Sequence, residues 1–170
     1  MKTIFFVVVI FLFSGGDLSV SLEKKANKAL KKSFGSENII WEEIAVDGYF
    51  EERPEPGFSL FSLTEGSISI GYLVVTTARG RYEYFDYCVI YNNDLTIRNI
   101  EILVYRSDHG HEIANKSWLN QFSGEKGCSL LYGDQIDAIS GATFSASSIT
   151  ADINKHCSLL QSLQDKNIIP

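Results

Sequence analysis

The chain has 170 residues, a length that fits one domain with a sizeable core. Hydrophobic residues make up 45% of it and charged residues 21%, which is the composition of a globular protein and not of a disordered one. The formal net charge of −6 argues against a nucleic-acid partner, because phosphate binding needs a basic surface.

The N-terminal segment has the pattern of an export signal. A lysine at the second position is followed by the short apolar run Thr3–Phe13 and by small residues, so we expect cleavage after Gly16 or after Ser21. The alternative is an uncleaved membrane anchor, although the apolar run is well short of the ~20 residues that span a bilayer. We therefore expect a signal peptide or anchor over residues 1–21 and a domain over residues 22–170. That domain would be exported, periplasmic or otherwise extracytoplasmic, with membrane association through the N-terminus as the second option.

One helix and a run of strands are expected in the first two thirds of the chain. Residues 22–34 (LEKKANKALKKSF) place apolar side chains at helical spacing with a basic outer face, and Gly35 ends this helix. Segments rich in β-branched and aromatic residues follow, separated by turn signals. These predicted strands are residues 38–46, 58–63, 67–77, 81–91 and 95–105.

Helical spacing returns in the last third of the chain. A short helix is expected after residue 105, with core side chains at Ile113, Trp118, Leu119 and Phe122. The final helix is amphipathic, and its apolar stripe is Ile149, Ile153, Cys157, Leu160 and Leu163. The prediction is an α+β fold: a single domain in which an antiparallel sheet has helices at both ends of the chain.

The cysteines give no metal or thiol motif. Cys88, Cys128 and Cys157 are an odd count without any CxxC, which leaves zinc ribbons and thioredoxin chemistry unsupported. Cys88 lies within a strand pattern and is expected to be a small buried hydrophobe. Cys128 and Cys157 flank a hydroxyl-rich segment and could pair across it, a choice that their spacing leaves open.

That segment, DAISGATFSASSIT, spans Asp137–Thr150 just ahead of the expected last helix. Helix capping accounts for one or two of its hydroxyls, with Ser145 or Ser147 as the expected caps. Thr143 can also act as an ester acceptor, since Gly141 has no side chain to block the approach of a bulky group. The helix start behind it favours negative charge, so a phosphate joined to Thr143 would be well placed.

Residues 137–143 (DAISGAT) resemble the flavinylation motif D-x-x-[ST]-G-A-T of FMN-binding domains. These domains occur in the FMN-carrying subunits of the sodium-pumping NADH:quinone reductase and of the Rnf complexes, and in small exported electron-transfer proteins. In the family, a flavin transferase joins FMN through a phosphoester to the threonine that ends the motif, which implies Thr143 as acceptor. Asp137 would belong to the signal that the transferase reads. The other cofactor-binding residues that the resemblance implies are Ser140, Gly141, Ala142, Ser145, Gly110 and His111.

Weaker similarity extends from about residue 58 to the last helix, because SIGYLVV, EILVYR, HGHEI and WLNQFSG follow one another in the order that the family shows. Two places depart from the family pattern. Phe144 and Ser145 stand where a threonine–serine pair is common. Asp108–Glu112 replaces a proline–glycine–leucine turn that packs against the flavin ring, so His111 would take the ring-packing position.

The resemblance implies an exported electron carrier with covalent FMN, more a redox subunit than a stand-alone enzyme. Its partners would be the flavin transferase and redox proteins of the cell envelope. One alternative is a non-covalent module for a small ligand or envelope component. Another is a metal-dependent hydrolase built on His109, His111 and Glu112, for which His156 is the only further histidine. One strand tyrosine is expected to face the flavin ring, and the candidates are Tyr82, Tyr84 and Tyr87.

Overall fold

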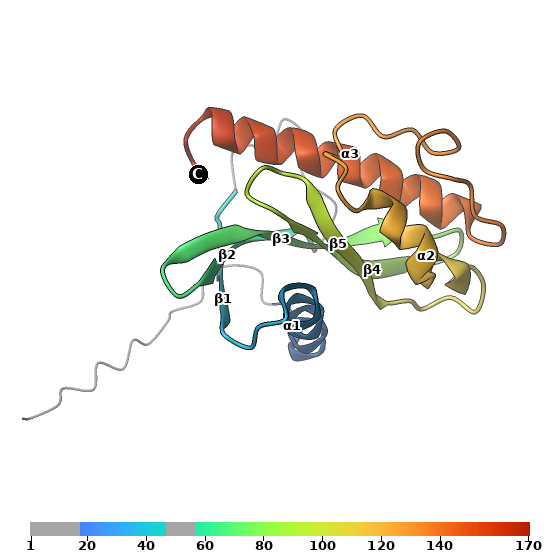
Figure 1. Cartoon of the computed structure of the whole chain (residues 1–170). Helices are drawn as coiled ribbons and strands as arrows, with labels where there is room; N and C mark the ends of the chain where they lie inside the picture. The colour runs from blue at the N-terminus through green and yellow to red at the C-terminus, as the bar shows by residue number, and fades with distance from the viewer. Residues whose placement is uncertain (1–17, 47–56) are drawn as a thin grey trace, which may run out of the picture.

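The computed structural model describes residues 18–46 and 57–170 of the chain (Figure 1). Helix α1 comes first and helix α3 last, with a sheet and three short helical turns between them. In chain order the elements are α1 (Val20–Phe34), β1 (Ile39–Glu43), β2 (Ser59–Glu65), β3 (Ile68–Arg79), β4 (Tyr84–Tyr91), β5 (Ile97–Val104), η1 (His111–Ala114), α2 (Lys116–Leu119), η2 (Asn120–Phe122) and α3 (Thr143–Asp165). None of the helices in the described ranges is both long enough and apolar enough to cross a membrane.

The sheet is an antiparallel meander in which each of its five strands pairs with the next one along the chain. Helix α1 covers one face, and α3 runs across the other together with α2 (Figure 1). The predicted α+β fold, a single domain with helices at both ends of the chain, is confirmed.

Each face of the sheet supports its own hydrophobic cluster, because side chains alternate along every strand. On β4, Tyr87 and Val89 belong to the larger cluster under α3, whereas Cys88 and Ile90 belong to the cluster under α1. This strand is therefore covered on both faces. Cys88 is fully buried, as expected, and burial raises the pKa of its thiol to about 12.

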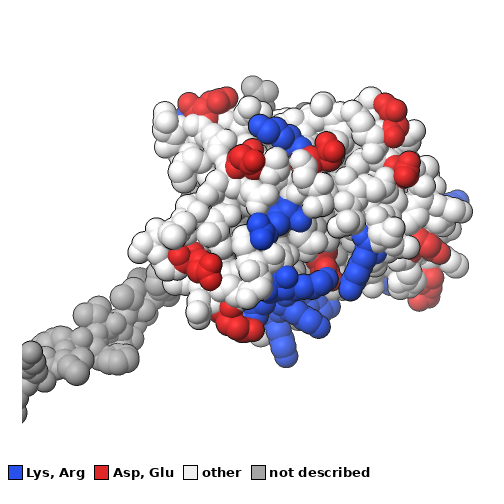
Figure 2. Space-filling model, viewed as in Figure 1, with Lys and Arg blue, Asp and Glu red and all other residues white. Residues whose placement is uncertain are grey.

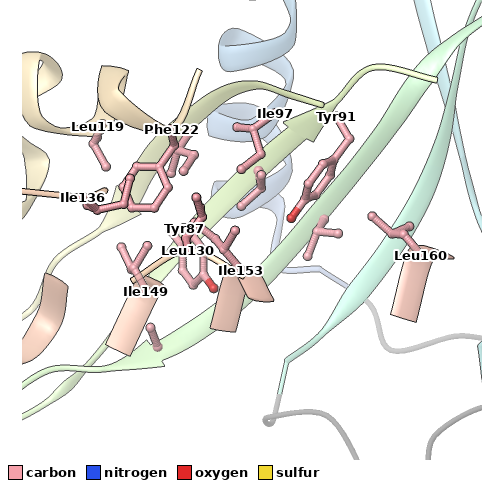
Figure 3. Close-up of a cluster of buried hydrophobic side chains, with 14 of the residues drawn as sticks. Tyr87, Tyr91, Ile97, Leu119, Phe122, Leu130, Ile136, Ile149, Ile153 and Leu160 are labelled. Atoms are coloured by element: carbon pink, nitrogen blue, oxygen red, sulfur yellow. The ribbon is translucent and has the colours of Figure 1, made fainter. Parts of the chain in front are cut away.

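The larger cluster fixes α3 against the sheet. Figure 3 shows Ile149, Ile153 and Leu160 of α3 around side chains from β4 and from the segment after β5. Trp118 and Phe122 are buried at the same face, which confirms them as core residues. Burial at this level contributes roughly 1.5–3 kcal/mol for each large apolar side chain, so the position of α3 is strongly determined.

Two local predictions were wrong. Residues 81–83 were expected to open a strand, but β3 continues to Arg79 and β4 begins only at Tyr84, so residues 81–83 lie in the connection between them. The Gly80 N–H donates to the Glu83 carbonyl across this connection. The last helix was expected to begin after the hydroxyl motif, whereas α3 begins at Thr143 itself.

The cysteine pairing that spacing left open is formed: Cys128 and Cys157 are joined by a disulfide. It connects the loop ahead of the motif to the middle of α3, 29 residues later in the chain. The bond therefore holds both flanks of the hydroxyl-rich segment together.

Candidate functional site

A cleft of about 590 Å³ lies where three separate segments meet. The β3–β4 connection, the loop after β5 and the start of α3 each contribute to its wall. The residues that line it are Arg81, Tyr82, Tyr105, His109, Gly110, Gly141, Ala142, Thr143, Phe144, Ser145 and Ser147. Five of the seven residues expected to bind the cofactor are among them: Thr143, Gly141, Ala142, Ser145 and Gly110.

Helix α3 begins at this cleft without a side-chain cap. Its N-cap residue is Ala142, which has no side-chain oxygen, and no side chain bonds to the first-turn N–H groups. The expected caps were wrong: Ser147 donates to the carbonyl of Phe144 at 3.0 Å, and Ser145 is buried. The first N–H groups of α3 are thus left for another partner.

Thr143 is the first residue of the helix and is exposed. Its Oγ1 donates a 3.3 Å hydrogen bond to the carbonyl of Ile139, which holds the hydroxyl at the helix end. Because this bond is long and the residue faces solvent, the oxygen is accessible to a reacting group.

Three side chains fix the backbone of the motif ahead of Thr143. The Trp118 indole donates to the carbonyl of Asp137 at 2.7 Å, and the Asp137 N–H donates to Gln121 at 2.9 Å. The Tyr132 hydroxyl accepts from the Ile139 N–H at 3.2 Å. The motif is therefore held in one conformation by residues that the sequence did not identify as part of the site.

Gly141 has a backbone conformation that favours glycine, and the Glu112 carboxylate occupies the space where a side chain would lie. The φ of Gly141 is +87°, in the left-handed region. A Cβ there would lie 2.7 Å from the carboxyl carbon of Glu112, an exposed side chain whose far end can rotate away. The room above the backbone of Gly141 is therefore bounded by a movable carboxylate and not by rigid backbone.

Gly110 lies beside Gly141 and forms a tighter contact. Its φ is +89°, and a Cβ there would lie 2.4 Å from the Tyr105 hydroxyl. That hydroxyl donates to the His109 carbonyl at 2.9 Å and lies 3.3 Å from the Oγ of Ser145. Tyr105 thus links the loop after β5 to the first turn of α3, and Gly110 makes this link possible.

Two of the expected cofactor residues do not line the cleft. Ser140 is exposed in the turn before it. His111 is exposed in η1, where its ring packs against that of Tyr105 at 5.1 Å between centroids. The histidine that lines the cleft is His109, two residues earlier.

The outer rim of the cleft is aromatic and cationic. Tyr82 is 64% exposed, and its ring lies 5.9 Å from His109 and 5.5 Å from the Arg81 guanidinium. Phe144 is 49% exposed beside Thr143. Of the three tyrosines considered, Tyr82 lines the cleft and Tyr87 is fully buried in the core. Large rings left in water beside the Thr143 hydroxyl offer surface for a flat ligand.

The histidines do not assemble into a metal centre. In residues 18–46 and 57–170, no group of three or more His, Cys, Asp or Glu side chains is arranged to hold a metal ion. His156 lies buried in the core against Phe58 and Tyr87, away from the exposed His109 and His111.

No protein-family model matches the chain, and no curated protein matches it in sequence. Among solved structures, NqrC of Shewanella oneidensis matches with a TM-score of 0.58 and 15% sequence identity. The chain shares its fold with NqrC. The match covers 84% of this chain and 98% of the NqrC chain, so the similarity extends well beyond the motif and its helix. At 15% identity this similarity describes the fold alone.

Proposed function

We propose that the chain is an exported electron carrier whose FMN is joined by a phosphoester to Thr143. One observation carries the proposal: the exposed Thr143 hydroxyl lies at the uncapped start of α3 and lines a cleft of about 590 Å³. The D-x-x-S-G-A-T spacing places this threonine where the flavinylation motif has its acceptor. The fold shared with NqrC is an independent similarity that does not depend on the motif.

The residues of the cleft fit a flavin mononucleotide. Pockets that hold cofactors of this size measure about 300–1,000 Å³, and this cleft lies within that range. Gly110 and Gly141 contribute backbone alone to its lining. The unpaired N–H groups at the start of α3, together with the helix dipole, favour a phosphate group there.

The roles of the residues follow from their positions. Thr143 supplies the ester oxygen, and Arg81 supplies positive charge on the cleft wall. Tyr82 and Phe144 present exposed rings to a planar ligand. FMN supplies the redox chemistry when bound, while the chain supplies position, ring environment and access for partner proteins.

Covalent attachment is useful outside the cytoplasm, where a released flavin would be lost by diffusion. The proposed partners are a flavin transferase for maturation and redox proteins of the cell envelope. Of the two expected cleavage positions, the one after Gly16 keeps the Ser19 cap of α1, whereas cleavage after Ser21 removes it. We therefore expect a mature N-terminus at Asp17, which N-terminal sequencing of the protein from its native host would test.

Co-expression with a flavin transferase and Mg²⁺ tests the attachment. The protein should gain the mass of FMN less one water, and its band on a denaturing gel should fluoresce under ultraviolet light. Thr143→Ala should lose both signals, and Ser140→Ala, an exposed hydroxyl three residues away, should retain them. If the wild-type protein is yellow but loses its colour on denaturation, the flavin is bound without a covalent bond. That result would support the alternative of a non-covalent binding module. A protein that never acquires flavin would refute the proposal.

A further inference from the structure

Helix α1 concentrates positive charge on a protein that is acidic overall. Its 15 residues contain five lysines, and they contain only one acidic residue, Glu23. The whole chain, by contrast, has 15 basic and 21 acidic residues. The lysines are Lys24, Lys25, Lys28, Lys31 and Lys32.

Four of these lysines share the outer face of the helix, whereas the Lys25 ammonium group donates a 2.8 Å hydrogen bond to the Leu103 carbonyl of β5. The buried face is formed by Ala26, Ala29 and Leu30, which pack against the sheet. Since side chains three and four positions apart lie on the same side of a helix, Lys24, Lys28 and the Lys31–Lys32 pair project away from that core. Figure 2 shows the result as the largest group of blue atoms in this view, at the place where α1 lies in Figure 1.

Only part of this charge is neutralised by the protein itself. Lys31 pairs with Glu37, and Lys32 lies 3.6 Å from Glu101; both are partly exposed pairs, which bind weakly. Lys24 and Lys28 are exposed and have no acidic partner in the described part of the chain. We call the outer surface formed by Lys24, Lys28, Lys31 and Lys32 the lysine face.

We propose that the lysine face of α1 binds an anionic membrane surface through lipid phosphate groups. Four flexible ammonium groups on one face suit a diffuse layer of negative headgroups, whereas recognition of a defined anion favours the rigid fork of arginine.

The arrangement of the fold leaves the cleft free when the lysine face is occupied. Helix α1 and helix α3 cover opposite faces of the sheet (Figure 1), and their core clusters are separate. A membrane that contacts α1 therefore leaves Thr143 and the cleft rim open to a redox partner. This inference does not depend on the flavin, since it rests on charge and position alone.

The test is a competition between two vesicle populations for the mature chain that begins at Asp17. One population is pure phosphatidylcholine, and the other contains about 30% phosphatidylglycerol; the two are separable by density. Because the mature chain lacks the apolar run, the ratio of bound protein reports the charge interaction. The wild type should prefer anionic vesicles by tenfold or more at low salt, and the preference should fall steeply in 0.5 M salt.

Two paired variants locate the effect. Each lysine near an anionic surface contributes about fivefold to binding, so Lys24→Gln with Lys28→Gln should lower the ratio by roughly tenfold or more. Lys116→Gln with Lys126→Gln removes two exposed lysines elsewhere and should change it less than about twofold. Unfolding curves that superimpose would show that both variants fold.

Three results would overturn the proposal. The first is a wild-type ratio near one, which would leave an acidic protein as the partner of the lysine face. The second is an unchanged ratio in the Lys24 and Lys28 variant. The third is an equal loss in the control variant, which would attribute the effect to net charge.

Discussion

The first turns of α1 and α3 are built in opposite ways. At α1, the Ser19 side chain accepts a hydrogen bond from the Leu22 N–H, so a hydroxyl satisfies the helix end. At α3, the segment is rich in hydroxyls, yet Ala142 occupies the cap position and no side chain of the described residues makes a cap hydrogen bond there. A protein that caps one helix with a serine leaves the other uncapped beside the cleft that Thr143 lines.

This difference shows that the hydroxyls at α3 have other partners. Ser145 is buried next to the Tyr105 hydroxyl, and Thr150 donates to the Ala146 carbonyl within the helix. Thr143 faces the cleft. Capping would contribute about 1 kcal/mol of stability, so the uncapped end gives up stability that a bound phosphate can restore.

The largest effect is expected from the disulfide, which distinguishes the two helices. Cys157 of α3 is bonded to Cys128 in the preceding loop, whereas α1 contains no cysteine. Closing a loop of 29 residues contributes about 3–4 kcal/mol to the free energy of unfolding. Replacing Cys128 and Cys157 together by Ser should lower the unfolding free energy in urea by that amount. Reductant should destabilise the wild type and leave the double variant unchanged; equal sensitivity of the two proteins would contradict the prediction.

Acid should destabilise the buried side of α3 through His156. Burial, with a smaller contribution from Lys155, lowers the pKa of His156 from 6.5 to about 3. Between these values the unfolded chain binds a proton that the folded chain does not, so stability falls as the pH falls from 6.5 toward 3. His156→Phe should flatten this part of the stability profile measured by thermal unfolding. An equally steep profile would remove His156 as a cause.

Gly110 tests how the cleft wall is joined to the start of α3. Gly110→Ala and Gly133→Ala impose similar backbone strain, since φ is +89° and +87°, but only the first displaces the Tyr105 hydroxyl. We expect a loss of about 1 kcal/mol at Gly133 from strain. At Gly110 we expect about 2 kcal/mol, because the hydrogen bonds of Tyr105 are lost too. Flavin loading should fall severalfold for Gly110→Ala alone, and equal loading of both variants would disprove a role for this wall.

The smallest changes in unfolding free energy are expected from substitutions at the two helix ends. Ser19→Ala should cost about 1 kcal/mol of unfolding free energy, because it removes a cap. Thr143→Ala should cost less than about 0.5 kcal/mol, since the exposed side chain caps nothing. Urea denaturation measures both. A Thr143→Ala protein destabilised as much as Ser19→Ala would mean that the threonine has a structural role.

The sheet was predictable because its signals are local. β-branched and aromatic runs separated by turn residues predicted all five strands, and the apolar stripe of α3 predicted the helix that packs on them. The error at residues 81–83 is informative: Arg81 and Tyr82 suit a strand by composition, but the Gly80–Glu83 hydrogen bond turns the chain there and brings both to the cleft.

The site was only partly predictable, because it depends on contacts between distant segments. The motif identified Thr143 and its neighbours, but no pattern connects Trp118 to the backbone of Asp137, 19 residues away. His111 was chosen by its place in a family turn, whereas the loop after β5 brings His109 to the cleft instead. Local sequence rules predicted that Ser145 caps the helix. In the structure its hydroxyl is instead the partner of the Tyr105 hydroxyl, which belongs to the neighbouring loop.

Thr143 is proposed to carry the flavin, and mapping the modified residue tests this most directly. Wild-type protein matured with a flavin transferase would be digested and its flavin-bearing peptide sequenced by tandem mass spectrometry. We expect the mass of FMN less one water on Thr143, with Ser140, Ser145 and Ser147 unmodified. Flavin on any of those serines, or on a peptide outside residues 137–150, would contradict it.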